Sequence, residues 1–205
     1  MPPAEQRGAA GTVGAARTQY DVERLLAVAV AVFIERGYDR TSMEDLARAT
    51  GISKSSIYHH ITSKEELLRL AVERALGALF AVTEEPGATS GPAVKRLEHV
   101  LGRMVEVLAA ELPYVTLLLR VRGNTETERW ALGRRRDFDR IVRRLVSQAA
   151  SAGAIREDLD VGLVERLVTG MINSVTEWYR PGRVAVDELR DTVVTLTMAS
   201  LEGER

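Results

Sequence analysis

Apolar side chains recur at intervals of three and four residues through most of this 205-residue chain. After Val22 the repeat is carried by Leu25, Leu26, Ala29, Val32 and Phe33, and it ends at Gly37. This spacing gathers apolar groups on one face of an α-helix, and no stretch shows the sustained alternation of apolar and polar residues that marks strands. The sequence therefore predicts an all-α fold with about nine helices.

Glycine and proline divide the rest of the chain into further helical segments. Ser63 is a candidate cap for a long helix that runs to about Val82, with Glu66 placed as in a capping box. The tract from Glu85 to Pro92 holds two prolines and two glycines, which predicts a loop. Later helices are expected at about 93–110, 113–122, 125–152, 161–179 and 184–201.

Three regions are expected along the chain. Residues 1–16 hold two Pro, three Gly and five Ala but almost no large apolar side chain, so they cannot offset the entropy lost on ordering, and we expect a flexible arm. Residues 17–63 are expected to form a small helical domain and residues 64–205 a larger one. The composition is 45% apolar, which is enough to bury a core.

A short helix is predicted directly after Thr41 and Ser42. Either hydroxyl can cap it, and Glu44 lies three residues after Thr41, as a capping box requires. Gly51 can adopt the left-handed conformation that ends such a helix.

A second short helix follows this glycine turn. Ser53 is placed to cap it, and Ile57 and Ile61, four residues apart, face inward. The side chains left on its outer face are those of Lys54, Ser55, Ser56, Tyr58 and His59. Two short helices with a tight glycine turn form a helix-turn-helix, which presents its second helix to a DNA major groove.

Characteristic residues continue on both sides of this motif. They are Gly37-Tyr38, Thr41-Ser42-Met43, Gly51-Ile52-Ser53, Ile57-Tyr58-His59-His60 and Ser63-Lys64-Glu65-Glu66-Leu67. With these spacings the segment resembles the amino-terminal domain of TetR-type transcriptional regulators. Ile61 departs from the pattern, because the family more often has Phe there.

The resemblance implies a set of DNA contacts. Tyr58 and Lys64 are expected to bind phosphates, and Thr41 or Ser42 to donate to the DNA backbone. Near the bases the resemblance places Lys54, Ser55, Ser56 and His59. It also implies that the larger domain forms a homodimer and binds a small effector, so that the protein acts as a repressor released from double-stranded operator DNA. The sequence leaves activation open as an alternative to repression.

The overall charge gives no sign of a polyanionic partner. The formal net charge is -1, and residues 1–70 hold nine Lys or Arg and nine Asp or Glu. Glu44, Asp45, Glu65 and Glu66 lie in first helical turns, where acids are favoured, whereas Lys54 and Lys64 should face the duplex. We therefore expect moderate nonspecific affinity and a modest salt dependence.

Several other classes of protein are disfavoured. The chain has no Cys, which removes thiolate zinc sites and Cys nucleophiles, and its only histidines are His59, His60 and His99. No nucleophile–base or metal-ligand spacing appears, so we expect no catalytic residue, no metal and no cofactor. No apolar run reaches the roughly 18 residues of a membrane span, and we expect a cytoplasmic protein without membrane contact.

The last two predicted helices carry broad apolar faces. Such faces can be internal core, and the resemblance favours a four-helix dimer interface built from two copies of this pair. The candidate interface residues are Val164, Val168, Met171, Val175, Leu189, Val193 and Leu196.

An arginine-rich run precedes these helices. Its members are Arg120, Arg122, Arg129, Arg134, Arg135, Arg136, Arg140, Arg143 and Arg144. Acidic residues are interspersed, which indicates a solvated charged face, but planar guanidinium groups also suit the recognition of phosphate or carboxylate on an effector.

The segment Trp178-Tyr179-Arg180-Pro181-Gly182 resembles the carboxy-terminal part of regulators of CoA-activated acid and steroid catabolism, and a simple helix end is the alternative. Our hypothesis for the effector is an acyl-CoA. The expected pocket residues are Leu101, Val105, Leu117, Leu118, Trp130, Arg134 and Met171. A hydrophobic drug-like molecule or another metabolite is the alternative effector. A helical interaction module without DNA binding is the alternative function.

Overall fold

The structure is a computed structural model that describes residues 10–156 and 158–202, with side chains described from residue 22 onward. These residues form ten α-helices and no β-strand, which confirms the all-α prediction. By compactness the chain divides into two units, residues 1–71 and 72–205. The division falls inside the helix α4 (Lys64–Val82) rather than at its start, where we had expected the boundary.

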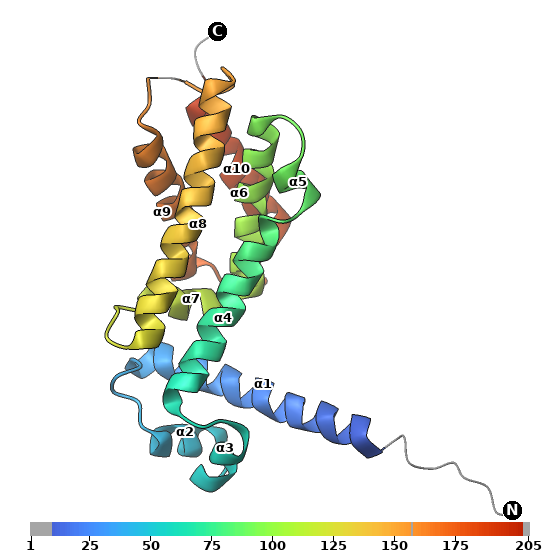
Figure 1. Ribbon diagram of the computed structural model, residues 1–205, viewed down its shortest axis with the longest axis vertical. Coiled ribbons are helices and arrows are strands. Elements are labelled where there is room, and N and C mark those ends of the chain that lie inside the picture. Colours follow the sequence, from blue (N-terminus) through green and yellow to red (C-terminus); the bar gives the residue numbers. More distant parts are fainter. Residues whose placement is uncertain (1–9, 157, 203–205) are drawn as a thin grey trace, which may run out of the picture. The chain divides into compact units, whose positions relative to one another are not determined.

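The first unit contains α1 (Ala10–Arg36), α2 (Met43–Thr50), α3 (Lys54–His60) and the first turns of α4. Phe33, Leu46, Ile57, Leu67 and Leu68 are fully buried and come from all four helices. Figure 1 shows α2 and α3 as two short helices joined by a tight turn beside α1. This is the arrangement expected of a helix-turn-helix with a supporting helix.

The helix α1 starts earlier than the sequence pattern indicates. Residues 10–16, which we expected in a flexible arm, belong to this helix, and residues 1–9 lie outside the described part of the chain. Alanine has the highest intrinsic helix propensity, so the alanine-rich stretch can extend a helix that is anchored by the apolar face after Val22.

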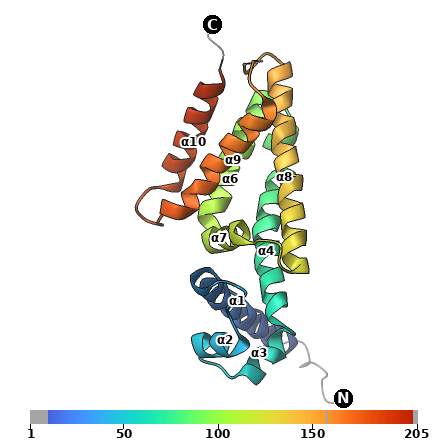
Figure 2. The same ribbon diagram turned by 90° about the vertical axis from the view of Figure 1, so that its left-hand side faces the viewer.

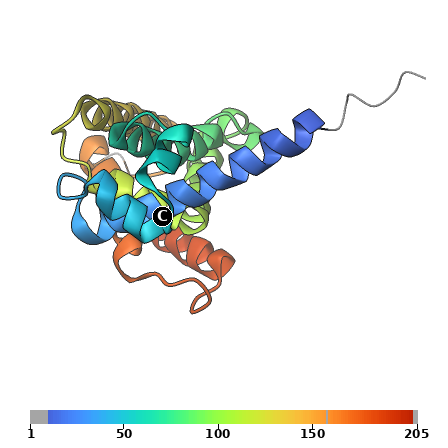
Figure 3. The same cartoon turned by 90° about the horizontal axis from the view of Figure 1, so that it is seen from below.

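The second unit is a bundle built around α6 (Ala93–Ala110). This helix packs against α8 (Glu126–Ser151), α10 (Val186–Leu201), α7 (Leu112–Arg120) and α9 (Val161–Trp178). Figures 2 and 3 show α10 on one side of α6 and α8 on the other. Leu97, Leu101, Leu118 and Ile172 are fully buried in this unit. None of the helices in the described residues is long and apolar enough to cross a membrane.

The loop expected from Glu85 to Pro92 contains one turn of helix, α5 (Pro86–Thr89). Proline at the first helical position is compatible with a helix start, because its missing N–H would have no partner there. The ring of His99 in α6 lies so close to Gly87 that a Cβ added at this glycine would fall 2.5 Å from His99 Nδ1. Only glycine therefore allows α5 to pack on α6 in this way.

Candidate DNA-binding face and ligand cavity

The helix α3 has the orientation predicted from its sequence. The Ser53 side chain caps it by accepting a hydrogen bond from the N–H of Ser56 at 3.1 Å. Ile57 and Ile61 are buried, whereas Tyr58 and His59 are exposed. Lys54 and Ser55 are also exposed, and Ser56 is half-buried. The side chains available to a DNA groove are therefore mainly those expected from the sequence.

The cap of α2 is one of the two expected hydroxyls, but the capping box uses a different pair from the expected Thr41 and Glu44. Ser42, not Thr41, is the N-cap, and Asp45, not Glu44, completes the capping box. The hydroxyl of Thr41 donates to the main-chain carbonyl of Gly37 at 2.8 Å, and this side chain is only 2% exposed. Thr41 therefore holds the loop before α2 together and does not present its hydroxyl to DNA, whereas Ser42 is exposed.

Lys64 has a structural role as well as a charge. Its ammonium donates to the main-chain carbonyls of Tyr38 and Thr41, both at 2.9 Å, and lies 4.2 Å from the centre of the Tyr38 ring. An ammonium group has three donors, so one remains for another acceptor. The residue expected to bind phosphate thus first ties the start of α4 to the loop between α1 and α2.

Lys54 on the recognition helix forms an ion pair with Glu44 on α2. The Lys54 hydrogen bond lowers the pKa of the Glu44 carboxyl, and the same bond raises the pKa of Lys54. Both side chains are exposed, so the pair is solvated and open to exchange for a phosphate or a base.

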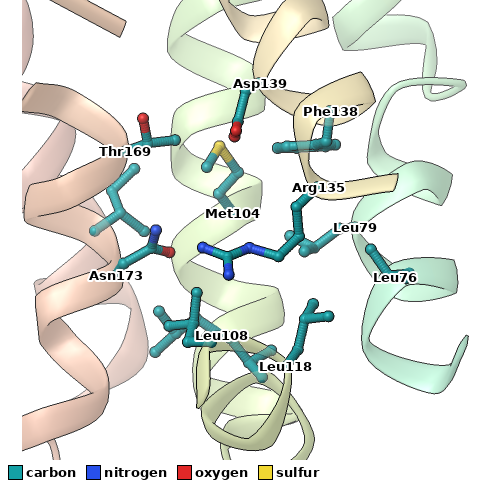
Figure 4. A pocket seen from close by; sticks show the side chains of 13 residues that line it. Leu76, Leu79, Met104, Leu108, Leu118, Arg135, Phe138, Asp139, Thr169 and Asn173 are labelled. Carbon is teal, nitrogen blue, oxygen red and sulfur yellow. The ribbon is translucent and has the colours of Figure 1, made fainter. Parts of the chain in front are cut away.

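A partly enclosed cavity lies within the second unit and contains about 510 Å³ of empty space, part of it open to solvent. Apolar side chains from α4, α6 and α7 line one part of it, including Leu76, Met104, Leu108 and Leu118 (Figure 4). Its polar side chains all come from α8 and α9. They are Arg135, Asp139, Thr169 and Asn173.

Most of the expected pocket residues lie elsewhere. Of the seven, Leu118 lines the cavity. Leu101, Val105 and Leu117 are buried in the core but do not line it, and Trp130 and Met171 are half-buried outside it. The expected Arg134 lies over the ring of Phe80, 3.9 Å from its centre, and pairs with Asp137 at 3.2 Å.

The arginine that enters the cavity is the next one along, Arg135. Its guanidinium lies across the cavity and points toward Asn173, above Leu108 (Figure 4). Burial lowers the pKa of Arg135, and the nearby Asp139 carboxylate only partly opposes this effect. Within the described residues, neither Arg135 nor the Asn173 amide has a hydrogen bond or an ion pair. A half-buried cation without a hydrogen bond in a largely apolar cavity favours an anionic or strongly polar ligand.

Other arginines of the run have local partners. Arg134 and Arg140 both pair with Asp137 on the outside of α8, and Arg143 pairs with Glu165 of α9 at 3.0 Å. These arginines therefore form local ion pairs and do not line the cavity.

The expected dimer-interface residues differ in how far a single chain already buries them. Val164, Val168, Val175, Leu189 and Val193 are buried within the single chain, Met171 is half-buried, and Leu196 is 60% exposed. The exposed large apolar side chains of α9 and α10 are Leu163, Leu167, Trp178, Val186 and Leu196. The sequence pattern alone could not distinguish buried from exposed positions on α9 and α10, because both carry apolar side chains.

The comparisons with known proteins agree with this architecture. Residues 25–71 match the family model described as bacterial regulatory proteins, tetR family. Residues 90–201 match the model described as tetracyclin repressor-like, C-terminal domain.

Three similar proteins illustrate the match. The HTH-type transcriptional repressor KstR2 of Mycobacterium tuberculosis is 30% identical over 77% of this chain and 80% of its own. The fatty acid metabolism regulator protein of Bacillus subtilis is 25% identical over 76% of this chain and 81% of its own. The solved structure of SCO3833 from Streptomyces coelicolor A3 is 61% identical, covers 87% of this chain and 91% of its own, and has a TM-score of 0.83. The chain therefore belongs to the TetR family of bacterial transcriptional repressors, with a helix-turn-helix DNA-binding domain and a helical carboxy-terminal domain.

Proposed function

We propose that this repressor binds its operator as a homodimer and is released by a small organic acid or its acyl-CoA thioester bound in the cavity of the second unit. A carboxylate and a thioester share a carbonyl oxygen, which is the group that a guanidinium recognises. The observation that carries the proposal is Arg135, a half-buried cation that points into a largely apolar cavity, where it feels the charge of Asp139 but has no hydrogen bond or ion pair among the described residues.

The shape of the cavity supports an acyl group as its occupant. The apolar lining from α4, α6 and α7 can bury an aliphatic or cyclic group, while Arg135 and Asn173 on the opposite side can donate to its carbonyl oxygen. We place only the acyl portion of a thioester in the cavity, with the larger CoA portion outside its open side. Among the relatives, one is named a fatty acid metabolism regulator and KstR2 is described as a ketosteroid transcriptional regulator.

On the DNA side, we assign base contacts to the exposed part of α3. Lys54, Ser55 and His59 face outward there, with Ser56 at the edge, while Tyr58, Ser42 and the remaining donor of Lys64 suit phosphates. Two such helices about 34 Å apart in a dimer can enter successive turns of one major groove.

For the dimer we assign the exposed stripe of α9 and α10. Leu163 and Leu167 are four residues apart on α9, and Leu196 is 60% exposed on α10. Exposed apolar groups of this size cost solvation free energy in a monomer, and a two-fold interface covers the same patch on both subunits.

The helix α4 can connect the ligand to the DNA-binding domain. Leu76 and Leu79 of this helix line the cavity, and Lys64 ties its first turn to the loop between α1 and α2. A ligand that moves α4 therefore also moves the helix-turn-helix. It releases the operator only if it binds the released conformation more tightly than the DNA-bound one.

The experiment starts with an operator fragment selected from random DNA by binding to the full chain. Hexanoic acid, hexanoyl-CoA, and a set of neutral and cationic hydrophobic drugs are titrated into the complex, and DNA release is followed by fluorescence anisotropy. Release by the acid or the thioester supports the proposal, and the stronger of the two identifies the form. Release by the drugs alone would refute the acid proposal and favour a drug-sensing repressor.

A further inference from the structure

Polar side chains on α8 and α9 follow each other in steps of four residues. The two helices run antiparallel and pack together, so successive residues of the set on α8 lie opposite successive residues of the set on α9 (Figure 2). We call this set the polar ladder. It consists of Arg143, Asp139 and Arg135 on α8 and Glu165, Thr169 and Asn173 on α9.

The outer end of the polar ladder is closed. The Arg143 guanidinium pairs with the Glu165 carboxylate at 3.0 Å, although Glu165 is only 3% exposed. The Thr169 hydroxyl lies 3.0 Å from the same carboxylate and can donate to it or to the main-chain carbonyl of Glu165. This end satisfies its own hydrogen-bonding groups without a ligand.

The inner end of the polar ladder is open and faces the cavity. Figure 4 shows the Asp139 carboxyl on the level of Thr169 and the Arg135 guanidinium pointing toward Asn173. The carboxyl, the guanidinium and the Asn173 amide have no hydrogen bond or ion pair among the described residues. Half-buried polar groups in a largely apolar cavity are satisfied either by water or by matching groups of a ligand, so their chemistry indicates which ligand groups would fit.

The Arg135 guanidinium and the Asp139 carboxylate require different groups on a ligand. Arg135 is a donor only, and it needs an acceptor such as a carbonyl or carboxylate oxygen. Asp139 as a carboxylate is an acceptor only, and it needs a donor such as a hydroxyl. Arg135 and Asp139 are four residues apart on α8, which is a rise of about 6 Å along the helix. Because the bonds of an extended chain zigzag, a span of this size takes roughly five bonds, namely four carbon–carbon bonds from the carbonyl carbon and the bond to the hydroxyl oxygen.

We propose that the ligand is an oxygenated acyl group, whose carbonyl is bound by Arg135 and Asn173 and whose hydroxyl oxygen, about five bonds from the carbonyl carbon, donates to Asp139. A plain aliphatic acyl chain fills the cavity but leaves the Asp139 carboxyl without a donor. This inference rests on the proposed function, because it concerns the ligand of the same cavity.

The test uses direct binding to the full chain without DNA, measured by calorimetry. The probes are hexanoyl-CoA, 5-hydroxyhexanoyl-CoA and 2-hydroxyhexanoyl-CoA, together with hexanoic acid. We expect the 5-hydroxy compound to bind roughly tenfold more tightly than hexanoyl-CoA, as one hydrogen bond to a charged group allows. The 2-hydroxy compound, whose hydroxyl is too close to the carbonyl, should show no such gain.

Three variants assign the gain to Asp139. In Asp139→Leu the ratio of the two dissociation constants should fall to about 1, whatever the variant does to the affinity for hexanoyl-CoA itself. Asp139→Asn should keep part of the gain, because the amide oxygen still accepts. Asp137→Asn is the matched control, since Asp137 lies on the outside of the same helix and pairs with Arg134 and Arg140. It should keep the whole gain.

Two results would overturn the inference while leaving the proposed function intact. One is hexanoyl-CoA binding with no advantage for the 5-hydroxy compound, and the other is an advantage that survives Asp139→Leu. If neither hexanoyl-CoA nor hexanoic acid binds the wild-type chain, the proposed ligand class fails and this inference fails with it.

Discussion

The ammonium of Lys64 donates to the main-chain carbonyl of Tyr38 at 2.9 Å and lies over the ring of the same residue. A second bond to the Thr41 carbonyl makes Lys64 the tie between α4 and the loop that precedes α2. We expect Lys64→Met, which keeps most of the apolar stem, to lower the free energy of unfolding by about 1–3 kcal/mol, since the carbonyls lose a charged donor.

The same variant tests the expected phosphate contact. Loss of one contact reduces the slope of log affinity against log salt by about 1 and weakens binding almost equally across DNA sequences. Chemical denaturation and salt titrations of DNA binding measure the two effects separately. An unchanged free energy of unfolding would contradict the structural role, and an unchanged salt slope would contradict the phosphate contact.

Glu44 restrains the lysine of the recognition helix. In the wild type, Lys54 must leave its ion pair with Glu44 before it can bind a phosphate. Glu44→Gln removes the pair and with it this cost. We expect nonspecific DNA binding at low salt to strengthen by no more than about fivefold, because exposed ion pairs contribute little. Asp45→Asn serves as a comparison from the same helix, where the carboxylate belongs to the α2 capping box instead. Weaker nonspecific binding in Glu44→Gln would show that Glu44 does not restrain Lys54.

Asp139 makes stability depend on pH. Burial raises the pKa of its carboxyl, and the charge of Glu165 raises it further. The ionised carboxylate therefore destabilises the folded state above this raised pKa, and this loss is absent at a pH below the ordinary value of 3.8. Asp139→Asn should be more stable than the wild type at pH 7, with a gain that shrinks as the pH falls toward 4. Urea denaturation at both pH values measures it, and a gain that grows at low pH would contradict the assignment.

Two neighbouring residues of α9 distinguish the proposed dimer interface from the core. Leu167 is 64% exposed, whereas Val168 is 8% exposed. Leu167→Glu should give a folded monomer, because a charge in the proposed interface prevents association. Val168→Glu should instead unfold the second unit, because it places a charge in the core of a single chain. Light scattering gives the mass and circular dichroism the folding. A dimer of wild-type mass and stability in Leu167→Glu would move the interface elsewhere.

The short-range features could be predicted from the sequence because they depend on local chemistry. Ser53 caps α3 and Gly51 takes a positive φ of 72° after α2, as the pattern indicated. The sequence left the cap of α2 open between Thr41 and Ser42, and the expected capping box of Thr41 and Glu44 was wrong by one residue, because two hydroxyls and two acids are adjacent. In the structure the Thr41 hydroxyl is already bonded to the Gly37 carbonyl, which leaves Ser42 as the cap.

The residues around the cavity could not be predicted in the same way. Arg134 and Arg135 are adjacent, and their directions differ by about 100° around the helix, so which one enters the cavity depends on the rotation of α8. That rotation is fixed by packing on α6 and α9, not by the local sequence. The polar signal that could have found the site is the repeated step of four residues from Arg143 to Asp139 to Arg135, opposite Glu165 and Asn173.

Arg135 and its neighbour Arg134 provide the most direct test of the account. The measurement is the concentration of hexanoyl-CoA that releases half of a selected operator fragment, for the wild type, Arg135→Met and Arg134→Met. We predict that Arg135→Met raises this concentration by at least about tenfold, because it removes a charged donor to the ligand, while the melting temperature does not fall. Arg134→Met, which loses its pair with Asp137 outside the cavity, should respond as the wild type does. Equal responses of wild type and Arg135→Met, or a loss confined to Arg134→Met, would contradict the account.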